Sequence, residues 1–195
     1  MINENTDCIN TENTFIIDCK DIVLREFRLE DLDELYVLTL QPEITNYMPE
    51  WIGTREKYED AMSNVFIIKN KEFFKAIPNV ENHSITLGII LKKTNEFIGW
   101  CFACQNRDLP NCNTEIAYAI SKYHRNKGYT TQATKELIKY LFKETTMDTL
   151  SALALKNNLS SNRVIQKCGF KFVESIDIGK CEFNWYKLCK KRECS

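Results

Sequence analysis

The chain has almost no excess of either charge, with 26 lysines and arginines against 27 acidic residues and a formal net charge of −1. A balanced charge creates no long-range field that would recruit nucleic acid or an anionic membrane. The sequence also has no apolar run near the roughly 20 residues of a membrane-spanning helix, and its acidic, asparagine-rich start lacks the basic and apolar regions of a signal peptide. We therefore expect a soluble, cytoplasmic protein with no nucleic-acid or membrane partner.

Histidine is scarce, and His83 and His124 are the only two. They lie far apart in the sequence and neither pairs with a nucleophile, so we interpret both as surface loop residues and not as catalytic bases. Cysteine occurs nine times, an odd number that, without an export signal, favours reduced thiols over a disulfide framework. Cys101-x-x-Cys104 has the spacing of a zinc site, but it lies in a strand-like run with no second pair or nearby histidine. We expect these cysteines to be core residues and expect no metal site.

The length of 195 residues fits one well-buried domain and is too short for two. There are no internal repeats. We divide the chain into a mobile, polar N-terminal extension at 1–20, a single domain at 21–190 and a tail at 191–195. Within the extension, the apolar residues 15–17 are able to dock on the domain.

One stretch near the middle of the chain predicts a strand, a turn and a helix. Residues 114–120 alternate with the period of a strand, which places Glu115 on one face among small alanines. After the basic turn at 125–128, apolar residues recur at helical spacing. The turn therefore opens a helix, whose first backbone N–H groups lack internal partners and carry partial positive charge. Such a turn can hold phosphate oxygens, with Arg125 and Lys127 adding charge.

The turn reads Arg125-x-x-Gly128-x-Thr130 and resembles the acetyl-CoA pyrophosphate loop of the GNAT N-acetyltransferase superfamily, Arg/Gln-x-x-Gly-x-Gly/Ala. Thr130 departs from that pattern, because the family places glycine or alanine where the backbone approaches the pyrophosphate. Its branched side chain either crowds the cofactor or donates a hydrogen bond to it, and the sequence leaves both readings open.

A second segment, Asn158-x-x-Ser161-x-Arg163-Val-Ile-Gln-Lys-Cys-Gly169-Phe170, resembles the Asn-x-x-Ser-x-Arg-Val-Leu-x-Lys-x-Gly-Phe segment of the branch that acetylates ribosomal protein N-termini, the RimJ/RimL-like branch. In physical terms Asn158 caps a helix and Gly169 supplies the left-handed turn that ends it. The spacing of this segment from the Arg125 turn also matches the family.

The resemblance implies a mixed α/β (α+β) fold, the GNAT fold, with a strongly twisted mixed sheet of six or seven strands, about four helices and splayed central strands. The element order is β-α-α-β-β-β-α-β-α-β-β. The sequence places strands at 22–27, 84–92, 97–106, 114–120, 148–155, 170–175 and 182–188, and helices at 31–38, at 54–69, after Gly128 and after Asn158.

The resemblance also implies acetyl-CoA as cosubstrate. The cofactor-binding residues that it implies are Ala119, Ile120, Ser121, Arg125, Asn126, Lys127, Gly128, Tyr129, Thr130, Asn158, Ser161 and Lys167. On the acceptor side, Tyr47, Met48 and Trp51 fall in the segment that lines the acceptor cleft in this branch.

The implied reaction is direct acetyl transfer to an amine within a ternary complex. The amine must first lose a proton, because ammonium pKa values lie near ~8 for an α-amine and ~10 for a lysine. Glu115 is our candidate base, the alternative being an exposed strand acid. The departing thiolate needs a proton or a hydrogen bond, for which the resemblance points to Ser161, with Tyr118 as the second candidate. The alternative for Ser161 is a helix residue that bonds only the backbone.

Two further alternatives remain open at this stage. The domain is either an enzyme or a catalytically silent CoA-binding or ligand-sensing module. The acceptor is a protein N-terminus, a polyamine or an aminoglycoside-like amine, and the acids in the acceptor segment, Glu43, Glu50, Glu56 and Glu59, favour a polycation. The sequence leaves the choice between a monomer and a homodimer undecided.

Overall fold

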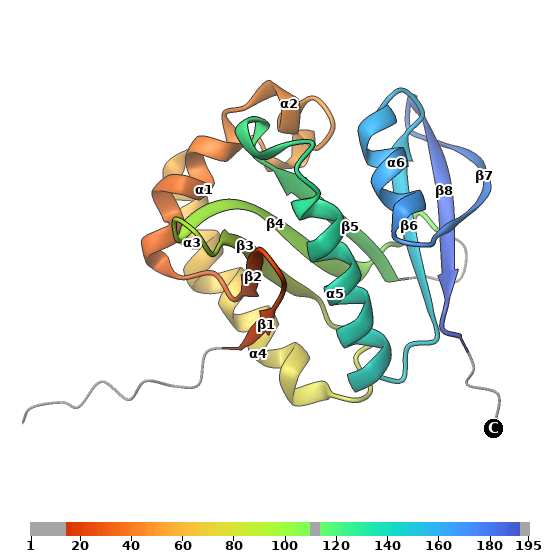
Figure 1. Ribbon diagram of the computed structural model, residues 1–195, viewed down its shortest axis with the longest axis horizontal. Coiled ribbons are helices and arrows are strands. Elements are labelled where there is room, and N and C mark those ends of the chain that lie inside the picture. Colours follow the sequence, from red (N-terminus) through yellow and green to blue (C-terminus); the bar gives the residue numbers. More distant parts are fainter. Residues whose placement is uncertain (1–14, 110–113, 192–195) are drawn as a thin grey trace, which may run out of the picture.

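An eight-stranded sheet organises the part of the chain that the computed structural model describes, residues 15–109 and 114–191 (Figure 1). The strands are β1 (Ile16–Asp18), β2 (Ile22–Arg25), β3 (Ile85–Leu91), β4 (Glu96–Gln105), β5 (Thr114–Ile120), β6 (Thr149–Leu155), β7 (Lys171–Ile178) and β8 (Cys181–Cys189). Their order across the sheet is β1-β2-β3-β4-β5-β6-β8-β7. The paired strands are antiparallel except for β5 and β6, which are parallel.

Helices cover both faces of this sheet. They are α1 (Leu32–Thr39), α2 (Pro42–Thr45), α3 (Arg55–Ala61), α4 (Ile67–Ala76), α5 (Tyr129–Glu144) and α6 (Leu159–Lys167). A π-helical stretch, Met62–Phe66, joins α3 to α4, and short 3-10 turns lie at Pro49–Trp51 and Lys122–His124. No helix within the described residues combines the length and the apolar character that a membrane crossing requires.

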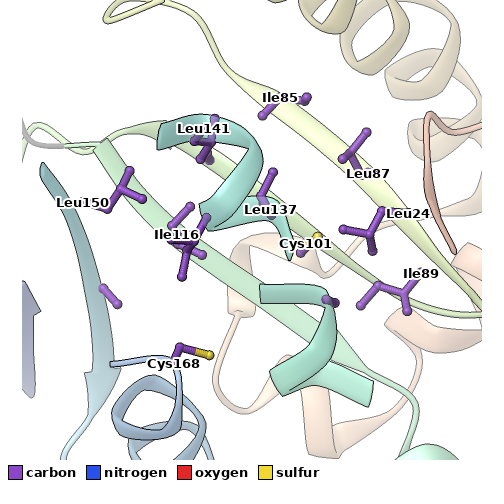
Figure 2. Packing of buried hydrophobic residues seen from close by; sticks show 14 of the residues in the cluster. Leu24, Ile85, Leu87, Ile89, Cys101, Ile116, Leu137, Leu141, Leu150 and Cys168 are labelled. Carbon is purple, nitrogen blue, oxygen red and sulfur yellow. The ribbon is translucent and has the colours of Figure 1, made fainter. Parts of the chain in front are cut away.

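The hydrophobic residues form two clusters, one on each side of the sheet. On one side, Leu141 of α5 packs with Ile116 of β5 (Figure 2). On the other side, Leu35 of α1 packs in the cluster that contains Trp100 of β4. Trp100 and Cys101 are adjacent in β4 yet belong to different clusters, because successive side chains of a strand point to opposite faces. Cys101 is fully buried in its cluster, which confirms its assignment as a core residue.

The centre of the sheet opens between β5 and β6. β4 and β5 pair over seven positions, whereas β5 and β6 pair only at Glu115 and Ser151. Beyond that single pair the two strands diverge, and Figure 1 shows the sheet dividing there, with α5 on one side and α6 on the other. The divergence leaves backbone groups of both strands without a ladder partner, and an unpaired backbone group needs another partner such as water or a ligand.

The sequence predicts the order of the elements correctly but undercounts the strands. The additional strand is β1, which lies in the part of the chain assigned to a mobile extension. It forms because Phe15 packs between Phe74 and Tyr140, at ring-centroid distances of 4.6 and 4.9 Å, and so holds the next residues against β2. The docking of residues 15–17 was expected, and the strand was not. Residues 1–14 and 192–195 lie outside the described residues.

The helix ends follow the predicted signals. Thr54 accepts a hydrogen bond from the backbone N–H of Lys57 at 3.3 Å, and Asn158 accepts one from Ser161 at 3.2 Å, so both side chains act as N-caps. Gly169 ends α6 with a φ of +96°. The second predicted helix is longer than expected, since α3, the π-helical stretch and α4 continue to Ala76.

Candidate active site

A cavity of about 690 Å³ lies where β5 and β6 diverge. Its walls come from the segment after α1, the end of β4, both divergent strands, the start of α5, and α6. Both faces of β5 contribute to the cavity. Glu115 and Tyr118 are three residues apart in the strand, so their side chains point to opposite faces, and yet both line the cavity. Such access requires the strand to have no close neighbour on its β6 side, as the single β5–β6 pair provides.

Glu115 is the acid at the point of divergence. Its Oε2 accepts a hydrogen bond of 2.6 Å from Nδ2 of Asn106, at the end of β4. Burial raises the pKa of Glu115 from an ordinary 4.5 to about 7. The hydrogen bond from Asn106 and one from the backbone of Leu153 lower that pKa, and the charges of Glu50 and Asp108 raise it further. A carboxylate with a pKa near neutrality can both accept and release a proton at physiological pH.

Tyr118 and Ser161 form a hydroxyl pair on the opposite wall. The Tyr118 hydroxyl lies 3.1 Å from the Ser161 carbonyl oxygen, to which it donates, and 3.1 Å from Ser161 Oγ, where either group can donate. Burial raises the pKa of Tyr118 above its ordinary value, so the phenol keeps its proton. The pair can therefore supply a hydrogen bond or a proton to a group that becomes negative in the cavity.

The N-terminus of α5 forms the third part of the wall. Gly128 stands at the N-cap with a φ of +84° and no side-chain cap, and the first hydrogen bond of the helix runs from Gln132 N–H to its carbonyl at 3.0 Å. The N–H groups of Tyr129, Thr130 and Thr131 precede that bond and have no partner within the helix. A Cβ atom built on Gly128 meets no atom within 4 Å, so the space in front of these N–H groups is open. The arrangement suits an anion such as a phosphate.

The segment 41–51, which we call the acceptor loop, contains α2 and forms another wall of the cavity, where its start contacts the turn that leads to α5. Tyr47 and Met48, two of the residues assigned to the acceptor, line the cavity. Trp51 does not line it, because its indole packs against Trp100 in a tilted arrangement, with ring centroids 4.3 Å apart, within the cluster that contains residues of α1 and α3. It thus anchors the end of the acceptor loop.

The predicted cofactor residues fall into two groups. Those that line the cavity are Ala119, Ile120, Arg125, Asn126, Gly128, Thr130, Asn158, Ser161 and Lys167. Ser121, Lys127 and Tyr129 flank it without lining it: Ser121 is buried beneath the turn, Lys127 is exposed, and Tyr129 packs against the core. The Oδ1 of Asn158 is engaged as the cap of α6 and also accepts from Ser160 Oγ at 2.9 Å.

Sequence reasoning missed several lining residues that come from distant segments. Asn106, Asp108 and Phe102 belong to β4 and the turn after it, and no local pattern marks them as site residues. Expected on the surface, His124 instead lines the cavity with a side chain only 10% exposed and Nε2 3.5 Å from Glu96. Its partner Glu96 lies in β4, distant in the sequence, so this position leaves no local signal.

The described part of the chain contains no cluster of three or more histidine, cysteine or acidic side chains able to hold a metal ion. The cysteines at 19, 101, 104, 168, 181 and 189 are unpaired, whereas those at 8, 112 and 194 lie outside the described residues. Burial raises the pKa of Cys104, which lies beside Glu115, to about 11, so this thiol is a poor nucleophile.

Comparison with known proteins gives the family. A protein-family model described as an acetyltransferase (GNAT) domain matches residues 21–171. An uncharacterized N-acetyltransferase of Bacillus subtilis (strain 168), YnaD, is 28% identical over 162 residues, which cover 80% of this chain and 82% of YnaD.

Solved structures agree in fold. A GNAT-family acetyltransferase from Bacillus anthracis has a TM-score of 0.72 at 20% identity, and RimL, a ribosomal-protein α-N-acetyltransferase in complex with coenzyme A, has a TM-score of 0.72 at 14% identity. Each covers 90% of this chain over 98% of its own length. Because the family model spans most of the sequence, the chain belongs to the GNAT acetyltransferase family, as the two sequence motifs predicted.

Proposed function

We propose that this protein transfers an acetyl group from acetyl-CoA to a primary amine by direct attack within a ternary complex. The observation that carries the proposal is Glu115, a carboxylate with a pKa of about 7 at the point where β5 and β6 diverge, facing a cavity of about 690 Å³. An acid that only occupies an exposed strand would not be expected at a buried position that faces a cavity. The likeness to RimL supports membership of the RimJ/RimL-like branch.

The residues present fit acetyl-CoA, which supplies the acetyl group as a thioester. The free N–H groups at the start of α5 and the open space at Gly128 suit its pyrophosphate. Lys167 and Arg163 of α6 add positive charge on the same side of the cavity. The small side chains of Ala117 and Ala119 leave room beside β5 where the pantetheine arm would pass. The unpaired backbone of β5 offers that arm hydrogen-bond partners.

Glu115 takes the proton of the acceptor ammonium, directly or through one water molecule. With a pKa of about 7 a substantial fraction of it is ionised at neutral pH, and it remains basic enough to take the proton as the amine attacks. Asn106 holds the carboxylate in place through its 2.6 Å hydrogen bond. Backbone N–H groups of the divergent strands stabilise negative charge on the carbonyl oxygen of the acetyl group.

The pair formed by Tyr118 and Ser161 assists the leaving thiolate. Tyr118 keeps its proton because burial raises its pKa, and Ser161 Oγ shares that proton at 3.1 Å. A hydrogen bond from either hydroxyl stabilises the thiolate as the carbon–sulfur bond breaks. Because two hydroxyls serve one role, loss of either is partly compensated by the other.

The acceptor end favours a cationic amine. Glu43, Glu50, Asp108 and Glu115 all line the cavity, and Glu50 and Asp108 lie close enough to raise the pKa of Glu115. The acids at 56 and 59, which the sequence placed in the same group, do not line it. We therefore propose an acceptor that carries a second positive charge near the reacting amine, as a polyamine, an aminoglycoside-like amine or a basic N-terminal peptide does.

The experiment is a transfer assay with acetyl-CoA and a panel of amines, read by the mass of the product. The panel pairs each diamine with a monoamine of equal length, and each basic peptide with its neutral counterpart. We expect acetylated product, with the dicationic member of each pair preferred. Coenzyme A binding in titration calorimetry without any product across the panel would favour the alternative, a catalytically silent CoA-binding domain.

A further inference from the structure

Two side chains connect the acceptor loop to the segment that leads from β5 to α5. Gln41, at the start of the acceptor loop, accepts a hydrogen bond of 2.8 Å at Oε1 from the backbone N–H of Lys122, and its Nε2 lies 3.5 Å from Ser121 Oγ. Arg125 donates from Nη2 to the backbone carbonyl of Glu43 at 3.0 Å. These contacts join residues about eighty positions apart in the sequence.

The side chain of Gln41 makes its contacts in the protein interior and not on the surface. Gln41 is 7% exposed and Ser121 is 4% exposed. A buried amide of this kind costs free energy unless it is hydrogen-bonded, and the Lys122 N–H would lose its partner without it. The bond is therefore retained whenever the acceptor loop lies in this position.

The acceptor loop is held at both ends, and between them Ile44 is buried in the hydrophobic cluster that contains Trp100. The start of the loop is bonded through Gln41 and Glu43, and its end is anchored by Trp51 on Trp100. Between these anchors the loop's own turns provide its hydrogen bonds, with the N–H groups of residues 44–48 bonded to carbonyls of residues 41–44. Tyr47 and Met48, which line the cavity, lie between these anchors, and Met48 also packs against that cluster.

The partner segment has a second role in the proposed function. Residues 121–125 connect the end of β5, where the pantetheine arm would bind, to the α5 N-terminus, where the pyrophosphate would bind. A ligand that holds both ends of this segment also fixes the groups that Gln41 and Glu43 bind. A ligand can shift a neighbouring equilibrium only if it binds one conformation more tightly than another, and fixing one side of a hydrogen bond meets that condition.

We propose that Gln41 and Arg125 are positioning residues that couple the two substrate sites, so that binding of coenzyme A at the N-terminus of α5 stabilises the acceptor loop. The inference rests on the proposed function, since it needs coenzyme A as the ligand of the α5 end. It assigns the Arg125 side chain to the acceptor loop, and leaves the pyrophosphate to the backbone N–H groups of α5 and to the other basic residues.

Hydrogen exchange tests the coupling without any acceptor. The amides of residues 44–48 exchange only when the acceptor loop opens, because their partners lie within the loop. Addition of saturating coenzyme A to the wild type is expected to slow their exchange about fivefold or more, the lower end of the usual range for coupling between sites. Calorimetry on the same samples gives the affinity for coenzyme A.

Two variants remove the hydrogen bonds between the acceptor loop and the segment before α5, one from each side. Gln41→Ala and Arg125→Ala should still bind coenzyme A within about fivefold of the wild type, while the protection of residues 44–48 on binding is lost. Arg125→Gln keeps an N–H donor without the charge and should restore part of the protection. Lys122→Ala is the matched control, because it removes a charge from the same exposed segment and keeps the backbone N–H that Gln41 binds.

Kinetics with a mass-verified acceptor add a second readout. Loss of coupling should raise the acceptor KM in Gln41→Ala and leave kcat near the wild-type value, because Gln41 does not act on the reacting atoms. A residue that only holds the fold would change the melting temperature and not the split between KM and kcat.

Three outcomes would overturn the proposal. The first is binding of coenzyme A to the wild type without slower exchange at residues 44–48, and the second is full protection in both alanine variants. A loss of coenzyme A affinity in Arg125→Ala that grows at low salt, and that Arg125→Gln does not restore, would make Arg125 a phosphate ligand instead. Failure of the proposed function is separate, since it shows as absent binding of coenzyme A or as absent transfer in the wild type.

Discussion

The two ends of the cavity are built in different ways. At the α5 end the groups that we propose for the pyrophosphate are backbone N–H groups from one short stretch of sequence, preceded by Gly128 with a φ of +84° and open space at its Cβ position. At the acceptor end the groups are side chains from separate elements, among them Asn106 after β4, Glu50 in the acceptor loop and Glu115 in β5. Tertiary packing alone brings them together.

This difference predicts how each end responds to substitution. Backbone N–H groups are present in every residue except proline, so the α5 end tolerates most changes of side chain and fails only where its shape changes. The acceptor end depends on the identity of each side chain, and through Glu115 it depends on pH. Specificity can therefore change at the acceptor end while the cofactor end stays the same.

The largest effect is expected at the acceptor end. Glu115→Gln keeps the size of the side chain and removes the base, so kcat should fall on the order of 10²–10⁴-fold. The affinity for coenzyme A, measured by calorimetry, should remain unchanged, because the group acts in the transition state and not on the cofactor. Wild-type turnover in this variant would show that Glu115 is only a strand residue.

At the α5 end, the largest effect belongs to Gly128→Val. The new side chain fills the open space before the helix N–H groups and is strained at a positive φ, so loss of one charge-assisted hydrogen bond of about 1.5–3 kcal/mol should weaken coenzyme A binding about 10- to 100-fold. Gly169→Val is the control, since Gly169 has a φ of +96° at a helix end outside the cavity lining. Equal coenzyme A affinity in both variants would remove the phosphate assignment.

Asn106→Ala should change the pH dependence more than the maximal rate. Its hydrogen bond lowers the pKa of Glu115, so its loss raises that pKa above about 7 and moves the rising limb of the pH–rate profile upward. Activity should fall at neutral pH and recover in more alkaline buffer. Asn64→Ala, which removes a 2.7 Å hydrogen bond to the exposed Asp60, should leave the profile unchanged, and an unshifted limb in Asn106→Ala would contradict the assignment.

The smallest effect is expected for Ser161→Ala. Tyr118 remains to bond the thiolate, and solvent can protonate a thiolate whose conjugate thiol has an ordinary pKa near ~8.5, so the loss in kcat should stay within about tenfold. Tyr118→Phe alone should behave similarly, and the double variant should lose more than the product of the two. Strict additivity of the free energies in this cycle would show that the two hydroxyls do not share a role.

Sequence reasoning succeeded where the determinants are contiguous. The strand of Glu115, the turn at Gly128 and the cap at Asn158 are marked by local periodicity, glycine and capping residues, and all three lie where they were expected. It failed for β1, for Asn106 and for the buried His124, because each is placed by partners far away in the chain. Trp51 illustrates the same limit: its segment was placed correctly, but its side chain turns to the core.

The pH dependence of kcat/KM tests the role of Glu115 most directly, measured with one verified acceptor in the wild type and in Glu115→Gln. The base must be ionised to act, so the wild-type rate should rise with pH and bend at about 7, the pKa of Glu115. In Glu115→Gln that bend should disappear, leaving only the limb of the acceptor amine at higher pH. A bend near pH 7 that persists in Glu115→Gln would contradict the account and assign the base to another group.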